Sequence, residues 1–347
     1  MHQAITQTDK KLTPLNLSET SLNPEAKITP MQDLVGQWKA KPLHGRYRSR
    51  IDDNAIDTKA SQGWLQSGNL FLETEGFIAS IQDQKLQRWI EKPLHGRHAN
   101  EISQENVDKK ASNYWLTSGQ MFPETEGFLV AIQDQVIPTN NYKRFILKNL
   151  QQSDKCRYGC QDSETHVTGG CQAFAPTDYK ERHDIAAKII HQELAYKLKL
   201  TECKLQYYKY TPQCVLENDK YKLYWDRTVL TDQYIKQNRP DIIIVDKGAQ
   251  KVTLIDVAIP NSNNLTYKNN EKVAKYRELE FQIKRQWKMK YVETIPIIMS
   301  STGVIPRSLL ENIKALELSE NIHKIIQKGV LLATARIVRK FMGNAST

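Results

Sequence analysis

Long apolar segments are missing from this 347-residue sequence. None of its hydrophobic runs approaches the roughly 20 residues that a helix needs to cross a lipid bilayer. The first residues, MHQAITQTDKKL, also lack the apolar centre that is typical of a secretory signal. The sequence therefore predicts a chain that neither spans a membrane nor enters the secretory pathway.

Cysteine is scarce as well, with five residues in the chain and three of them between positions 156 and 171. An odd number in this arrangement argues against a disulfide framework and favours a reducing compartment. The cluster provides three thiolates and one imidazole, a ligand set that suits tetrahedral Zn²⁺. We predict a zinc-knuckle-like site, the alternative being a degenerate site with free thiols. Its four residues are Cys156, Cys160, His166 and Cys171.

The remaining cysteines and two helix histidines carry weaker patterns. Cys203 and Cys214 stand apart from the cluster, and we expect them to be buried apolar side chains. His183 and His191 lie eight residues apart in one expected helix and hence on similar faces. For these histidines a core or surface role is a better prediction than metal binding.

Acidic residues are outnumbered, because 49 Lys and Arg face 39 Asp and Glu and leave a net charge of +10. This balance suits a polyanionic partner, since each cation on a phosphate releases a condensed counterion. The alternative is a solvated basic surface. Residues 268–290 hold eight cations against three acids, and Arg336, Arg339 and Lys340 form a second cluster. We predict salt-sensitive binding of DNA or RNA through both regions.

An internal repeat occupies much of the first half of the chain. Residues 41–84 match residues 92–135 without a gap, at 25 of 44 positions. The shared segments are KPLHGR, ETEGF and IQDQ, and a tandem duplication of one small helical module explains them. We assign the two copies to residues 37–90 and 91–150. Residues 1–36 are polar and aperiodic, and we predict a disordered arm there.

The sequence as a whole predicts an α+β fold, with a mostly helical N-terminal half and an α/β core in the C-terminal half. Residues 178–199 and 268–290 have helical apolar spacing, and three short apolar runs predict strands. These runs are 242–245, 252–259 and 292–299. An Asn218-Asp219 pair predicts a hairpin turn before them. The predicted divisions are 151–200 with the cysteine cluster, 201–305 for the α/β core and 306–347 for two C-terminal helices.

Acidic residues lie at the ends of two of the predicted strands. Asp241 follows Pro240 and opens the first strand, and Asp256 comes near the end of the second. Two acids at one end of a hairpin can hold a divalent cation, and a nearby lysine can orient or activate water for phosphodiester cleavage. Lys272 and Lys275 are three apart on the basic helix and hence on one face. The alternative is that both acids make ordinary turn and surface contacts.

These motifs together resemble the restriction-like endonuclease of site-targeting non-LTR retrotransposons. The resemblance rests on NRPDIIIVDK, LIDVAIPNSNNL and EKVAKY, and on KPLHGR, YKERHDIAAKIIH and RIVRKFMG outside the core. It implies a PD-(D/E)xK fold and a nuclear enzyme that nicks DNA with Mg²⁺ or Mn²⁺. The RNA of the retrotransposon is a second partner that the resemblance allows. The resemblance also implies metal ligands at Asp241 and Asp256, a catalytic lysine at Lys272 or Lys275, and a supporting role for Tyr276.

Three features depart from that family pattern. The sequence contains no Tyr-x-Asp-Asp polymerase signature, so we expect no reverse transcription from this chain. The KPLHGR module is duplicated, and the first cysteines are separated by three residues where the family pattern has two. These departures leave open a catalytically inactive nucleic-acid-binding remnant, or a rearranged gene product without a biological role.

Overall fold

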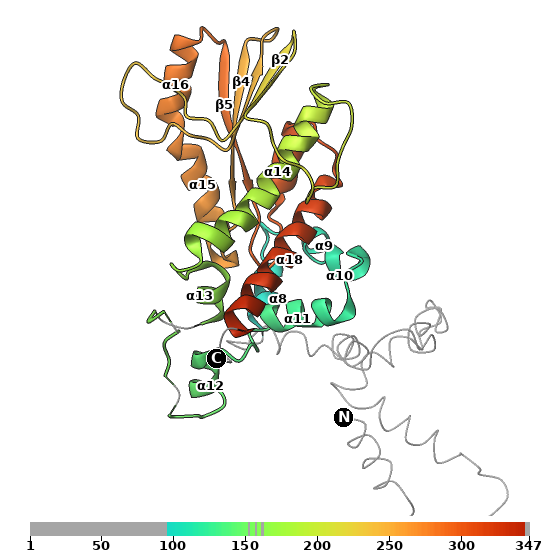
Figure 1. The fold of residues 1–347 in the computed structure, drawn as a ribbon, viewed down its shortest axis with the longest axis vertical. Coiled ribbons are helices and arrows are strands. Elements are labelled where there is room, and N and C mark those ends of the chain that lie inside the picture. The colour runs from blue at the N-terminus through green and yellow to red at the C-terminus, as the bar shows by residue number, and fades with distance from the viewer. Residues whose placement is uncertain (1–95, 152, 157, 161–162, 344–347) are drawn as a thin grey trace, which may run out of the picture. The chain divides into compact units, whose positions relative to one another are not determined.

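A mixed α+β fold surrounds one five-stranded sheet in the part of the chain that the structure describes (Figure 1). The computed structural model describes residues 96–343 except 152, 157, 161 and 162. The predicted arm and the first copy of the repeat lie outside these residues. No helix within them combines the length and apolar character needed to cross a membrane.

The sheet places its strands in chain order, β1 to β5. Neighbouring strands are antiparallel except β4 and β5, which are parallel. The hairpin turn predicted at Asn218-Asp219 is confirmed, because the Asn218 side chain accepts hydrogen bonds from the backbone of Lys220 and Tyr221. The three predicted strands are also confirmed. The bounds are Val215–Glu217 for β1, Tyr221–Trp225 for β2, Ile242–Asp246 for β3, Lys251–Ala258 for β4 and Tyr291–Ile298 for β5.

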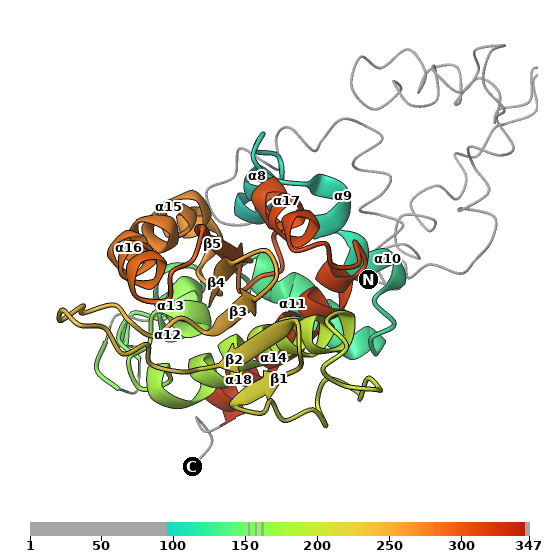
Figure 2. The same ribbon diagram turned by 90° about the horizontal axis from the view of Figure 1, so that it is seen from above.

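A pair of helices, α15 (Leu265–Lys275) and α16 (Arg277–Gln286), connects β4 to β5 and covers one face of the sheet (Figure 2). The single helix predicted over 268–290 is wrong, because the backbone leaves helical geometry at Tyr276 (φ −105°, ψ 5°). The apolar spacing continues across the break, with Leu279 and Ile283 buried beside Tyr276. Because the apolar residues keep their helical spacing on both sides of Tyr276, the sequence pattern gives no sign of the break.

Helices α14, α17 and α18 cover the opposite face. Their bounds are Lys180–Lys197, Arg307–Ala315 and Ile322–Gly343, which confirms the predicted helix near 178–199 and the two C-terminal helices. A short π-helix, Ala175–Tyr179, leads into α14. Because β4 lies between two helical layers, its six central residues are all buried, as expected for an apolar strand covered on both sides.

The second copy of the repeat packs directly onto α18 (Figure 1). Its ETEGF segment lies in a helix, as predicted, and Trp115, Leu129 and Ile132 join the buried cluster around Val338. This copy therefore shares a hydrophobic core with the C-terminal helix. Its helices are α8 (Arg97–Ile102), α9 (Lys109–Ser112), α10 (Tyr114–Ser118) and α11 (Pro123–Gln133). Two more short helices follow, α12 (Asn140–Phe145) and α13 (Glu164–Gly169).

Candidate functional site

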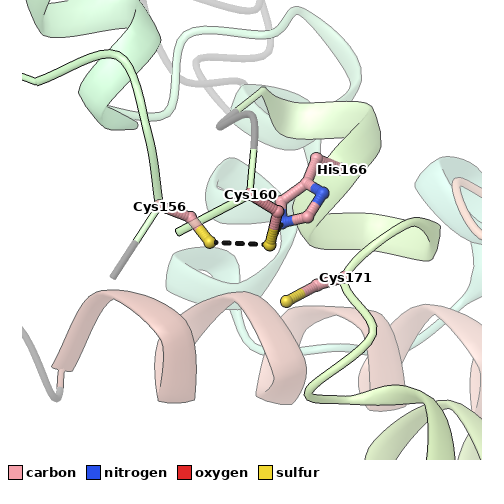
Figure 3. A group of neighbouring side chains, drawn as sticks. All are labelled: Cys156, Cys160, His166 and Cys171. Carbon is pink, nitrogen blue, oxygen red and sulfur yellow. Dashed lines mark hydrogen bonds between the residues drawn. The ribbon is translucent and has the colours of Figure 1, made fainter. Parts of the chain in front are cut away.

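The four predicted zinc ligands converge on one point (Figure 3). Their ligand atoms all lie within 4.8 Å of one another. The Cys160 sulfur is 3.0 Å from the Cys156 sulfur and 3.2 Å from His166 Nε2. The fourth ligand, Cys171, follows α13 and is fully buried. These residues are close enough to bind a metal ion, as the sequence predicted.

Local backbone geometry brings the first two ligands together. The backbone N–H of Cys156 donates to the carbonyl of Cys160 at 2.7 Å, and Gly159 donates back to Cys156 at 2.9 Å. Gly159 has a φ of +81°, which glycine adopts without the steric cost other residues would meet. Ser163 then caps α13 by accepting from the backbone of His166 at 3.1 Å. The tight turn and the capped helix compensate for the unusual spacing of the motif.

The ligand types and their spacing both fit a zinc ion. Zn–S bonds of about 2.3 Å in a tetrahedron separate the sulfurs by about 3.8 Å. The Cys156 and Cys160 sulfurs, now 3.0 Å apart, therefore need to separate by less than about 1 Å. A hydrogen bond from the Cys156 thiol, together with burial, raises the pKa of Cys160 above its ordinary value. Without a cation the Cys160 thiol thus keeps its proton, and a bound metal would replace that proton.

Hydrogen bonds attach the Cys3His cluster to the body of the fold. The Tyr179 hydroxyl contacts the carbonyls of His166 and Val167 at 3.0 and 2.8 Å, and accepts from the Cys171 backbone at 3.1 Å. Asn261, which follows β4, donates to the carbonyl of Thr165 at 3.0 Å. The cluster is therefore connected to the π-helix before α14 and to the segment after β4.

A buried arginine completes this connection. Arg182 on α14 is 2% exposed and donates to the carbonyl of Thr168 at 2.7 Å and to the Thr334 hydroxyl at 3.1 Å. Its second terminal nitrogen lies 3.5 Å from the carbonyl of Ile259. Burial lowers the pKa of Arg182 to about 10, so the guanidinium remains charged at neutral pH. It thereby joins α13, α18 and the end of β4.

Replacing this arginine tests the connection. We expect Arg182→Met to lower the free energy of unfolding by about 3 kcal/mol, because buried carbonyl acceptors lose their donor. The control is Arg336→Met, which removes a half-exposed arginine paired with Glu181 and should cost less than about 1 kcal/mol. Denaturant unfolding of both variants provides the measurement. Equal midpoints for the two variants would contradict a clamping role for Arg182.

A second group of polar side chains gathers where β4 ends. Asp256 is 2% exposed and forms ion pairs with both predicted lysines, Lys272 and Lys275, the latter at 3.1 Å. The Tyr276 hydroxyl donates a further hydrogen bond to the same carboxylate. These three partners come from the end of α15 and the residue after it, where positions three and four apart share a face. The structure thus brings four of the five predicted nuclease residues into direct contact.

Opposing effects act on the Asp256 carboxyl. Burial raises its pKa, but the ammonium groups of Lys272 and Lys275 and the Tyr276 hydroxyl outweigh burial and hold that pKa below its ordinary value. Burial and the Asp256 charge in turn raise the pKa of Tyr276. The carboxylate is therefore ionised at neutral pH and the phenol is protonated. The Lys272 ammonium contacts one carboxylate oxygen, Oδ2.

Asp241, the fifth predicted residue, lies at the same end of the sheet. Because Ile242 pairs with Ile255 across β3 and β4, Asp241 lies opposite Asp256 just beyond the ladder. Its carboxylate accepts from the backbone N–H of Val257 at 2.7 Å. Within the described residues its side-chain partners differ from those of Asp256. The prediction that the acids lie at one end of adjacent strands is confirmed.

His183 is a site residue that the sequence reasoning missed. Its Nε2 lies 3.1 Å from Asp241 Oδ2 and 3.2 Å from the carbonyl of Val257, and its Nδ1 lies 3.0 Å from Asp184. Burial lowers the pKa of His183, but the hydrogen bonds to Asp184 and Asp241 outweigh it and raise that pKa to about 10. The only sequence signal was the consecutive Arg-His-Asp at the start of an otherwise amphipathic helix.

A cavity of about 330 Å³ opens beside His183 and Asp241. Three cations and three carboxylates line it together with one tryptophan, so ligands of either charge would meet partners there. The lining residues are Lys180, His183, Asp184, Trp225, Asp226, Arg239 and Asp241. The cavity therefore gives solvent access to the Asp241 side of the site.

No protein-family model and no curated protein matches this chain. Function is therefore inferred from the geometry of the site and the resemblance of its motifs.

One histidine and two cysteines were predicted to have no metal-binding role. His191 is a buried core residue, as expected, bonded to Tyr210 at 2.7 Å. The expectation that Cys203 and Cys214 are buried is wrong, because both are exposed in the connection between α14 and β1.

Proposed function

We propose that this chain is a metal-dependent DNA endonuclease of the PD-(D/E)xK type, derived from the C-terminal part of a non-LTR retrotransposon polyprotein. The observation that carries the proposal is the contact of buried Asp256 with Lys272, Lys275 and Tyr276, opposite Asp241 on the neighbouring strand. Burying a carboxylate beside two lysine ammonium groups costs desolvation free energy. Such groupings cluster at functional sites.

The oxygens at this end of the sheet fit a hard divalent cation. Asp241 and Asp256 would hold Mg²⁺ or Mn²⁺, and the Val257 carbonyl adds a neutral oxygen ligand of the kind these cations accept. The buried Oδ2 of Asp256 is contacted by the Lys272 ammonium, and an ionised carboxylate has about four lone-pair sites, so the group still has lone pairs to offer. When bound, the metal supplies Lewis-acid stabilisation of charge on the attacked phosphate.

The protein side chains would supply the remaining chemistry. In hydrolysis, water attacks phosphorus, the P–O bond to the leaving oxygen breaks, and negative charge gathers on the phosphate oxygens. A lysine ammonium from Lys272 or Lys275 can stabilise that charge or orient the water. Tyr276 donates to Asp256 and to the Arg239 carbonyl at 3.1 Å, and so holds the carboxylate in place. His183 performs the corresponding task for Asp241.

An alternative is a nucleic-acid-binding remnant without turnover. The same contacts favour it, because two ammonium groups already neutralise Asp256 and such a network can be purely structural. A plasmid-nicking assay on purified full-length chain separates the two proposals. We expect conversion of supercoiled to relaxed DNA with Mg²⁺ or Mn²⁺, and none with Ca²⁺ or chelator. A chain that binds DNA but never nicks it with either metal favours the remnant.

The DNA-binding surface is proposed to follow α16 and the turn after it. Five cations there are exposed and form no ion pair with other described residues. The second predicted region is engaged internally, since Arg336 pairs with Glu181 and Lys340 with Asp178. Arg339 contacts Thr125. We therefore assign the main interface to Arg277, Lys284, Arg285, Lys288 and Lys290.

Salt dependence tests this interface. If five phosphates are neutralised, the logarithm of the binding constant should fall with log salt at a slope of about −4 to −5. Lys284→Ala and Lys288→Ala should each make the slope shallower by about 1. Lys220→Ala, which removes an exposed lysine in the β1–β2 turn, should leave the slope unchanged. Fluorescence anisotropy with a labelled duplex measures all four proteins, and a flat wild-type response would reject the interface.

A further inference from the structure

Residues 226–240 form most of the loop between β2 and β3 (Figure 2). Two large apolar side chains of this loop are exposed to solvent. Tyr234 is 90% exposed and Leu230 is 86% exposed, the highest fractions among the large hydrophobic side chains of the described residues. Isolated surface apolar residues need no explanation. Here, however, two such side chains share one loop beside the candidate site, which is typical of a surface that contacts a partner.

The β2–β3 loop is held in place by packing and hydrogen bonds. Val229 and Ile235 are buried in the same cluster as Tyr276 and Leu279. The backbone of Val229 donates to Asn238 at 2.8 Å, which draws the two arms of the loop together. The tip that carries Tyr234 is thus held between two anchored residues.

The loop also contacts the elements of the proposed nuclease. At its base, Arg239 forms a two-pronged ion pair with Asp226, with both distances 2.7 Å. The Tyr276 hydroxyl donates to the Arg239 carbonyl, and Asp241 follows two residues later. On the other arm, Gln233 accepts from Gln282 of α16 at 3.0 Å. The exposed tip is thus fixed relative to the two catalytic acids and to the basic helix.

Charge near the tip favours a polyanionic partner. Arg227 and Lys236 are exposed, and neither forms an ion pair with the other described residues. The acids of the loop are Asp232 and Asp226, and Arg239 already neutralises the latter. Aromatic rings interleaved with cations are typical of surfaces that bind bases and phosphates together.

We propose that the β2–β3 loop is a base-contacting element, in which Tyr234 stacks on an unpaired or unstacked DNA base beside the cut site. Leu230 packs against the neighbouring sugar or base, and Arg227 and Lys236 contact flanking phosphates. This inference rests on the proposed nuclease function and names the part of the DNA that the loop recognises. Stacking is indifferent to base identity, because every base presents a π-face. The loop would therefore favour DNA with an accessible base over intact duplex.

The test compares two DNA probes with the full-length chain. One is an intact duplex, and the other is the same duplex with a short single-stranded gap that contains 2-aminopurine. We expect wild type to quench the 2-aminopurine and to bind the gapped probe more tightly. Tyr234→Ala should lose the quenching and bind the gapped probe about tenfold more weakly, as expected for one lost stacking contact. Tyr234→Phe should retain both properties.

Tyr208→Ala is the matched control, since it removes another exposed tyrosine, in the connection between α14 and β1 and outside the proposed DNA interface. It should behave as wild type. If wild type binds and nicks DNA and Tyr234→Ala equals wild type on both probes, the loop proposal fails and the nuclease proposal stands. If wild type binds neither probe, both fail. If Tyr234→Ala instead dissociates a dimer in analytical ultracentrifugation while leaving quenching intact, the loop is a self-association surface and the proposal is overturned.

Discussion

Nicking should be lost when either acid at the sheet end becomes an amide. We expect Asp241→Asn and Asp256→Asn each to slow plasmid nicking by at least about 10³-fold, a barrier increase of about 4 kcal/mol. Each change keeps the shape of the side chain but removes the charge that would hold the metal. Binding should be unchanged or slightly tighter, because a negative charge near the phosphates is lost. Single-turnover nicking and anisotropy on the same preparations measure the two effects.

The control for these variants is Asp246→Asn at the other end of β3, where Asp246 accepts from the turn backbone of Ala249. It removes an equal charge from the same strand and should nick normally. Because Asp256 is buried between lysines, circular dichroism must accompany the assay, and the less buried Asp241 gives the safer comparison. Nicking that survives both changes would make the site assignment wrong.

The same assay distinguishes the two lysines. Lys272→Ala and Lys275→Ala need not behave alike, since Lys272 contacts Oδ2 of Asp256 and Lys275 contacts Oδ1. The larger loss of rate identifies the lysine that acts on the phosphate. If neither change reduces the rate, both lysines serve only to hold the carboxylate, and neither acts on the phosphate.

Zinc should be present at about one ion per chain, and its loss should destabilise the protein. We expect Cys171→Ser to abolish zinc binding, because the fully buried Cys171 has no room for a replacement ligand. When the free zinc concentration is about 1,000 times the dissociation constant of the site, the bound ion contributes about 4 kcal/mol to the free energy of unfolding. Elemental analysis and thermal unfolding give the two measurements.

Cys203→Ser offers a matched control, since it removes an exposed thiol far from the cluster in sequence. That variant should retain zinc and unfold at the wild-type temperature. A wild-type preparation without zinc, whose stability does not respond to added Zn²⁺, would leave the four donors as free thiols. The loss of zinc should also loosen α13, because His166 lies in this helix and Cys171 just after it.

Much of the fold follows from local patterns in the sequence. The apolar runs at 242–245 and 252–259 predicted strands because strands buried on both faces are continuously apolar. Asp241 and Asp256 fell at the ends of those runs, and a hairpin necessarily brings such ends together. The four zinc donors lie within sixteen residues of one another, so a turn and one short helix were enough to gather them. The first copy of the repeat and the predicted arm stay predictions.

Only the tertiary structure decided how the site is completed. His183 reaches Asp241 across 58 residues, and no local periodicity records a contact of that range. The helix break at Tyr276 was hidden, because the break keeps the apolar stripe while redirecting the phenol to Asp256. Cys203 and Cys214 were expected inside because cysteine is usually buried, yet burial depends on which loops the core covers. Local sequence determines elements and their ends, whereas packing between distant elements determines which polar groups meet.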